Sequence, residues 1–201
     1  MNRKRKTQDP CSGCNLHKER CICDQIPRMA LKTKISLVIH YKELQRSTNT
    51  GKLALKALSN SEIYSRGDKN SSLDLSNLIM PEYENFILYP SECAQDLDAK
   101  WVSTIKKPFH LIVPDGTWRQ ASKVHYRHPE IKLVPRIKVN TNHFSNPNLR
   151  KSPSENKMAT IVALANALEI IEGKTIQEEL LKIFLLKINQ TLSARGIKIE
   201  N

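Results

Sequence analysis

Short apolar runs alternate along this chain with segments whose apolar residues recur at helical spacing. Strands are predicted at 33–40, 61–65, 85–89, 109–115 and 131–139, the last with an interruption at Pro135. Helices are predicted at 47–58, 94–107, 117–127, 159–171 and from 175 onward. This alternation predicts an α/β domain with a mostly parallel sheet and flanking helices.

The segment 111–121 contains the clearest junction between a strand and a helix. Its apolar run ends at Asp115, Gly116 permits a sharp turn, and Thr117 is a suitable helix N-cap. Open α/β sheets bind ligands at such junctions, where backbone N–H groups lack partners. Asp115 is therefore expected at the mouth of a crevice. The alternative is an ordinary turn in which Asp115 has a local role and Trp118 packs in the core.

The last helix has an apolar face and two expected end signals. Gly173 is expected to end the preceding helix, and Thr175 with Glu178 has the spacing of a capping box. The apolar residues on the predicted face are Leu180, Leu181, Phe184, Leu185 and Ile188. This face is most simply part of the core, with a dimer surface as the alternative.

The charge of the chain indicates a polyanionic partner. The 201 residues have a formal net charge of +12 at pH 7, which favours nucleic acid first and an anionic membrane second. A basic soluble protein without such a partner is the alternative. We find no apolar run long enough to span a bilayer, and the basic residues 1–6 lead into no hydrophobic segment. A cytoplasmic, reducing location is therefore expected.

The cysteines are concentrated near the start of the chain. Four of the five lie within thirteen residues, at Cys11, Cys14, Cys21 and Cys23. Two closely spaced pairs of thiolates favour a structural zinc site over packed, reduced cysteines. Cys93 is expected to be a free thiol. The predicted organisation is a basic arm at 1–10, a four-cysteine zinc element at 11–27 and the α/β domain at 28–201.

Together these motifs resemble those of DTW-domain proteins, which are tRNA-uridine aminocarboxypropyltransferases related in fold to SPOUT methyltransferases. The resemblance rests on Asp115-Gly116-Thr117-Trp118 and on Cys21-Ile22-Cys23-Asp24, and it covers about residues 10 to 172. It implies a trefoil knot, S-adenosylmethionine as co-substrate and tRNA as partner. The implied reaction transfers the 3-amino-3-carboxypropyl group to a uridine and releases methylthioadenosine.

The resemblance also implies roles for individual residues. Asp115 is expected to be the base that activates the imide N–H of uridine. The residues expected to bind the co-substrate are Tyr89, Pro90, Pro114, Gly116, Thr117, Trp118, Leu149 and Thr160. The residues expected to bind RNA are His40, Asn49, Thr50, Arg119, Arg150 and Lys151. The chain departs from the family at Ala159, where Ser is usual, and at Val162, where Glu is usual.

Two other functions stay open at this point. One is a SPOUT-like RNA methyltransferase that uses the same co-substrate. The other is a non-catalytic zinc-ribbon RNA-binding protein, which the departures at Ala159 and Val162 favour. The modified position, the choice between tRNA and ribosomal RNA, and the choice between monomer and homodimer also stay open.

Overall fold

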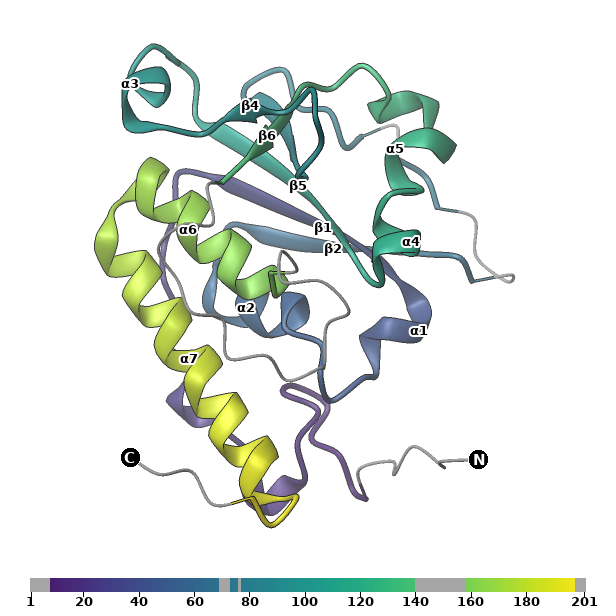
Figure 1. Cartoon of the computed structure of the whole chain (residues 1–201), viewed down its shortest axis with the longest axis vertical. Coiled ribbons are helices and arrows are strands. Elements are labelled where there is room, and N and C mark those ends of the chain that lie inside the picture. Colours follow the sequence, from purple (N-terminus) through teal and green to yellow (C-terminus); the bar gives the residue numbers. More distant parts are fainter. Residues whose placement is uncertain (1–7, 69–72, 76, 140–157, 198–201) are drawn as a thin grey trace.

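A computed structural model of the chain describes residues 8–68, 73–75, 77–139 and 158–197. In this part, six strands form one sheet in the order β2-β1-β5-β3-β6-β4 (Figure 1). All neighbouring strands are parallel. The strands are β1 Lys34–His40, β2 Ser61–Arg66, β3 Glu84–Leu88, β4 Gln95–Asp96, β5 Phe109–Asp115 and β6 Arg136–Lys138. The predicted parallel α/β fold is confirmed.

The helices differ greatly in length. α6 (Thr160–Glu172) and α7 (Lys174–Ser193) form a long antiparallel pair beside the sheet (Figure 1). The shorter helices are α1 Tyr41–Leu44, α2 Gly51–Ala57, α3 Ala99–Val102, α4 Trp118–Ala121 and α5 Val124–Arg127. Three 3₁₀ turns are η1 Lys18–Arg20, η2 Cys23–Gln25 and η3 Pro129–Ile131. Residues 140–157 lie outside the described part, and the implied trefoil knot stays a prediction.

The sheet separates two hydrophobic cores, and β5 is buried along its whole length. Leu111 and Val113 face the larger core, which includes residues of α2, α6 and α7. Ile112 faces the smaller core, with Val124 of α5 and Ile131 of η3. Side chains on a strand point alternately to opposite faces, so a central strand covered on both sides must be apolar throughout.

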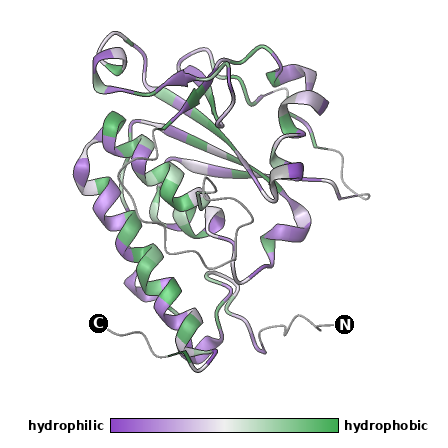
Figure 2. Ribbon diagram, in the orientation of Figure 1, coloured by the Kyte–Doolittle hydropathy of each residue, from purple (hydrophilic) through white to green (hydrophobic). Residues whose placement is uncertain are grey.

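α6 and α7 show different patterns of hydropathy. α6 is largely hydrophobic, whereas hydrophobic and hydrophilic residues alternate along α7 (Figure 2). Most of the predicted apolar face of α7 is buried, but Leu185 is 44% exposed, and the prediction that it joins the core is wrong. The buried face instead includes Ile183 and Lys187. No helix in the described ranges is both long and apolar enough to cross a membrane.

Two predicted elements are much shorter than expected. The helix predicted at 94–107 is reduced to the four residues of α3. The hydroxyls of Ser103 and Thr104 donate to the carbonyls of Lys100 and Trp101, and these bonds compete with continuation of the helix. The strand predicted at 131–139 is reduced to β6, because residues up to Ile131 form η3 and Pro135 has no N–H to donate.

Three further differences concern helix boundaries. The helix predicted at 117–127 is divided into α4 and α5, and the Ser122 hydroxyl donates to the Arg119 carbonyl near the break. α1 follows β1 directly and was not predicted. α7 begins at Lys174 with Gly173 as its N-cap and no side-chain cap, so the predicted capping box does not form. Gly173 has φ 112°, a conformation that favours glycine, and it ends α6 as predicted.

His110 of β5 is the centre of a buried polar network. Its side chain is fully buried, with Nδ1 2.8 Å from Asn85 Oδ1 and Nε2 2.8 Å from Ser36 Oγ. The side-chain oxygen of Asn85 can only accept, so neutral His110 has its proton on Nδ1. Nε2 faces the Ser36 hydroxyl, which also lies 3.3 Å from Glu62 Oε1. Burial and the charge of Lys34 lower the pKa of His110 to about 4.

We predict that His110 makes the fold sensitive to acid. Its folded pKa of about 4 lies below the ordinary histidine value of about 6.5, so the unfolded chain binds the proton first as the pH falls. Stability is therefore lost between about pH 6.5 and pH 4, by about 3 kcal/mol. We would measure urea unfolding of wild type and His110→Gln across this range. The difference between their free energies of unfolding should decrease by that amount as the pH falls.

The matched control is Ile137→Val, which removes one buried methyl group and changes no titratable side chain. Its stability should remain parallel to that of the wild type over the whole range. A constant gap between wild type and His110→Gln would contradict the assignment.

Candidate active site and metal centre

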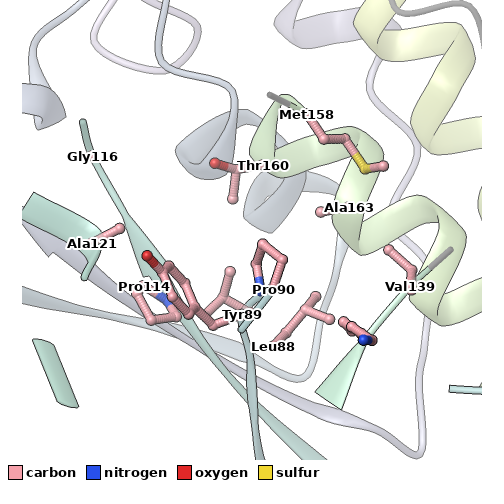
Figure 3. Close-up of a pocket in the computed structure, with 12 residues that line it drawn as sticks. Leu88, Tyr89, Pro90, Pro114, Gly116, Ala121, Val139, Met158, Thr160 and Ala163 are labelled. Carbon is pink, nitrogen blue, oxygen red and sulfur yellow. The ribbon is translucent and has the colours of Figure 1, made fainter. Parts of the chain in front are cut away.

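A cavity lies at the carboxyl edge of the sheet. It has a volume of about 150 Å³ and opens over the ends of β3, β5 and β6. Figure 3 shows α6 forming its wall beside these strand ends. The cavity is lined by Leu88, Tyr89, Pro90, Val113, Pro114, Gly116, Ala121, Lys138, Val139, Met158, Thr160 and Ala163. Ligands of open α/β sheets bind at this edge, because the strand ends and the following loops converge there.

Asp115 lies directly behind this cavity, at the last position of β5. Its side chain is only 6% exposed. The Thr160 hydroxyl of α6 donates to Oδ1 at 2.5 Å, and the Asn49 amide donates to Oδ2 at 2.6 Å. Thr160 itself lines the cavity, so this residue connects the cavity wall to the carboxyl group.

The environment of Asp115 favours proton uptake. Burial raises the pKa of Asp115, because the charged form loses its hydration. The hydrogen bonds from Thr160 and Asn49 lower this pKa, and the nearby charge of Glu43 raises it. The net effect is a raised pKa, which makes this carboxylate a stronger base than an exposed one.

The backbone near α2 is shaped to fit this carboxyl group. Asn49 Oδ1 accepts from the Lys52 N–H at 2.9 Å, which fixes the amide that faces Asp115. Gly51 follows, and a Cβ at this position would lie 2.9 Å from Asp115 Oδ2. Any side chain here would displace the carboxyl group, so glycine is required by close approach.

The turn after Asp115 is stabilised by a reciprocal cap. Gln120 donates its backbone N–H to Thr117 Oγ1 at 3.3 Å, and its side-chain oxygen accepts from the Thr117 N–H at 2.8 Å. This arrangement is a capping box, and it confirms the prediction that Thr117 caps the helix. Gly116 has φ 144°, which favours glycine at this turn.

Five of the eight residues predicted to bind the co-substrate line the cavity: Tyr89, Pro90, Pro114, Gly116 and Thr160. Thr117 is exposed at the start of α4, and Trp118 is the first residue of that helix. Leu149 lies outside the described residues. The structure therefore brings the described members of this set to one edge of the sheet, while their role in binding stays a prediction.

The residues predicted to bind RNA are more dispersed. His40 ends β1 and accepts the Lys42 N–H at 3.3 Å, so it caps α1. Asn49 and Thr50 are buried, and the Asn49 amide already contacts Asp115. Arg119 is exposed on α4. Arg150 and Lys151 lie outside the described residues. None of these RNA contacts is tested by the geometry.

The four N-terminal cysteines converge as predicted. Their sulfur atoms all lie within 4.8 Å of one another. Cys11 and Cys23 are 3.6 Å apart, Cys11 and Cys21 3.4 Å, and Cys14 and Cys21 3.9 Å. Zinc with Zn–S bonds of about 2.3 Å places tetrahedral sulfurs about 3.8 Å apart. The cluster therefore fits a tetrahedral Cys₄ zinc site.

Groups around the cluster support thiolates. Backbone N–H groups of Cys14 and Gly13 lower the pKa of Cys11 to about 6. Lys56 of α2 places Nζ 3.2 Å from Cys23 Sγ. A Cβ at Gly13 would lie 2.6 Å from this Nζ and 2.7 Å from this sulfur, so the turn requires glycine. These two contacts favour the deprotonated form that binds metal. Burial raises the pKa of Cys23, and hydrogen bonds with the neighbouring thiols raise the pKa of Cys21 to about 12.

Lys187 of α7 connects the cysteine segment to the loop that contains Asn49. It is only 1% exposed, and Nζ donates to the Cys14 carbonyl at 2.8 Å and to the Asn49 carbonyl at 3.1 Å. Burial lowers the pKa of Lys187 to about 8. A continuous path of contacts thus leads from the cysteines through Lys187 and Asn49 to Asp115.

Sequence reasoning missed several residues around the site. Lys138 and Val139 line the cavity because β6, which ends at Lys138, lies next to β3 in the sheet. Their position at the end of a predicted strand was the signal available in the sequence. Lys187 lies one turn before Thr191 and one turn after Ile183, both buried. Helical spacing was therefore the signal that could have placed this lysine on the buried face.

A comparison with protein-family models matches residues 8–192 to the DTW domain. The match includes both the cysteine cluster and the whole described sheet. No solved structure matches the chain.

Three curated relatives named tRNA-uridine aminocarboxypropyltransferase 2 are similar to the chain. The mouse protein (Mus musculus) is 26% identical over 86% of this chain and 60% of its own length. The macaque protein (Macaca fascicularis) is 26% identical over 88% and 61%, and the Drosophila melanogaster protein is 24% identical over 86% and 69%. The chain thus spans about 60% of the mouse and macaque relatives it matches.

We predict that the cysteine cluster binds about one zinc ion per chain. Cys14→Ser should lose the metal and lower the melting temperature, because metal binding and folding of such a short element are coupled. Elemental analysis and thermal unfolding of the purified proteins measure both effects. Cys93→Ser changes an exposed cysteine outside the cluster and should retain wild-type zinc. Equal metal content in all three proteins would rule out the site.

Proposed function

The chain belongs to the DTW-domain family, and from that membership we propose that it transfers a 3-amino-3-carboxypropyl group from S-adenosylmethionine to a uridine of tRNA. The three relatives named for this activity support the proposal. The observation that carries it is the pairing of Asp115 with Thr160 at the wall of the cavity. A buried carboxyl group joined to a cavity through a hydroxyl is suited to accept a proton from a bound substrate.

The chemistry of the cavity lining suits the co-substrate, while the volume of about 150 Å³ holds only part of a molecule of that size. The apolar lining includes Leu88, Val139 and Met158, which offer contacts to an adenine ring and a thioether. Lys138 lines the same cavity and supplies a positive charge for the carboxylate of the methionine part. The negative charge of the Asp115 carboxylate, which contacts the cavity-lining Thr160, favours the positive sulfonium.

The reaction requires activation of a weak nucleophile. The imide nitrogen of uridine attacks the carbon of the aminocarboxypropyl group that is bonded to sulfur. The new N–C bond forms as the C–S bond breaks, and the bonding electrons remain on sulfur, which leaves as methylthioadenosine. The imide proton must pass to a base, and general-base help of this kind contributes about 10²–10⁴-fold.

Asp115 is the proposed base, with Thr160 as a relay. Both carboxyl oxygens already accept hydrogen bonds inside the protein, and only 6% of the side chain is exposed. The uridine proton therefore passes to Thr160 Oγ1 while the hydroxyl proton passes to Asp115 Oδ1. Asn49 holds the other oxygen and fixes the orientation of the carboxyl group.

The departure at Val162 is consistent with this scheme. Val162 is fully buried in the larger core, and no residue that lines the cavity in the described ranges is acidic. Asp115 is joined to the cavity-lining residue Thr160 by a hydrogen bond, so we assign the role of the base to Asp115. Ala159 is the N-cap of α6 and supplies no side-chain cap, so the adjacent Thr160 is the hydroxyl at this helix start.

The cysteine cluster has a structural role in this proposal. Four thiolates fill a tetrahedral zinc ion and leave no position for substrate. Free thiolates in such a cluster require a reducing compartment, which supports the expected cytoplasmic location.

We predict that Asp115→Asn and Thr160→Val each reduce formation of acp-uridine by about 10²-fold or more, because each interrupts the same proton path. Thr160→Ser keeps the hydroxyl and should retain most activity. The assay incubates each protein with S-adenosylmethionine and bulk tRNA, followed by mass spectrometry of the nucleosides and of the spent co-substrate.

The products decide between the proposed reaction and the alternatives. Adenosylhomocysteine in place of methylthioadenosine would indicate a methyltransferase. No product from folded, zinc-loaded protein would favour an RNA-binding protein without catalysis. Full activity in Thr160→Val together with loss in Asp115→Asn would remove the relay and retain the base.

A further inference from the structure

A second group of side chains lies at the carboxyl edge of the sheet, beside the cavity. His40 ends β1 and Arg66 ends β2, and the two residues are register partners. Arg66 Nη1 donates to the Gln120 carbonyl of α4 at 2.7 Å. The next residue, Ala121, lines the cavity. α4 therefore has the cavity on one side and Arg66 on the other.

Arg127 and His128 complete this group, which we call the basic cluster: His40, Arg66, Arg127 and His128. The pKa of Arg66 is lowered by burial and then by the charge of Arg127. Burial also lowers the pKa values of His128 and His40, and the charge of Arg66 contributes to both shifts. α5 and His128 follow α4 closely in the chain, and Arg66 is bound to α4, so the placement of these residues agrees with their mutual electrostatic effects.

The two arginines lack a carboxylate partner within the described part of the chain. The ion pairs found there involve other lysines and arginines. Glu43 and Glu130 bear on the histidines of the cluster, but no acidic group contributes to the lowered pKa of Arg66. Placing two guanidinium groups together without an acid is unfavourable unless an anion binds them.

Tyr126 of α5 directly precedes Arg127 of the basic cluster. Its side chain is 75% exposed, although it is a large aromatic residue. It is close enough to Tyr89, which lines the cavity, to contribute to the raised pKa of that tyrosine. An exposed ring beside a positive cluster is the usual arrangement of a surface that binds single-stranded nucleic acid.

We propose that the basic cluster and Tyr126 bind the RNA strand next to the target uridine. Arg127 contacts a phosphate, Arg66 holds α4 and strengthens the positive field, and Tyr126 stacks on a neighbouring base. This inference rests on the proposed function and names the surface by which the RNA reaches the cavity. The phosphate charge supplies the anion that the two arginines lack.

The test compares tRNA binding by wild type, Arg127→Gln, Tyr126→Ala and Arg28→Gln at about 50 to 200 mM salt. Arg28 is an exposed arginine. The N–H of the next residue, Met29, donates to the Ala57 carbonyl at the end of α2, so Arg28 lies at the opposite edge of the sheet. Fluorescence anisotropy with bulk tRNA gives the dissociation constant, and calorimetry with S-adenosylmethionine gives co-substrate affinity.

Arg127→Gln should weaken tRNA binding about tenfold and lower the log–log salt slope by about 0.7 to 0.9, the value for one phosphate contact. Tyr126→Ala should weaken binding about tenfold with an unchanged slope, because stacking releases no counterions. Arg28→Gln should stay within about twofold of wild type, and all four proteins should bind S-adenosylmethionine equally.

A wild-type slope and affinity in Arg127→Gln would overturn the proposal, as would a selective loss of S-adenosylmethionine binding in that variant. Failure of the proposed reaction gives a different result. If wild type forms no acp-uridine but tRNA binding still depends on Arg127 in the stated way, the surface stands without the chemistry. If acp-uridine forms and Arg127→Gln has a wild-type KM for tRNA, the surface alone is refuted.

Discussion

The arrangement of the carboxyl edge depends on the buried carboxyl group of Asp115. A carboxylate that loses its hydration must be satisfied by the protein, and here the donors come from two segments far apart in sequence. Asn49 precedes α2, and Thr160 begins α6. By engaging both, Asp115 fixes the start of each helix relative to the end of β5. Thr160 also lines the cavity, so the contacts that satisfy this buried carboxyl group are the ones that the proposed chemistry uses.

The cysteine segment is part of the same structure rather than a separate attachment. Cys14, Leu16 and Ile22 pack in the larger core with residues of the sheet and of α7. Lys187 then joins the Cys14 carbonyl to the Asn49 carbonyl. A metal that orders this segment therefore also supports the loop that orients Asp115. In this arrangement the proposed zinc acts on the site through backbone position, without contact to substrate.

Sequence patterns located the features that depend on neighbouring residues. The apolar run of β5, the turn at Gly116 and the spacing of the four cysteines are local signals, and each is found as predicted. Features set by the lateral order of strands were beyond such reasoning. β5 lies between β1 and β3, and this order alone brings Asn49 to Asp115. Local competition also decided some elements, since the hydroxyls of Ser103 and Thr104 shortened a helix that its composition favoured.

The contacts of α7 with the cysteine segment have a consequence for biosynthesis. Lys187 and Cys14 are 173 residues apart, and so are Arg20 and Ser193, which are joined by a hydrogen bond. The cysteine segment is therefore synthesised well before α7 and must wait for α7 before the two can dock. Contacts of such long range form late in folding. Until then, early binding of zinc would hold the cysteines together and limit their exposure to oxidation or to wrong partners during synthesis.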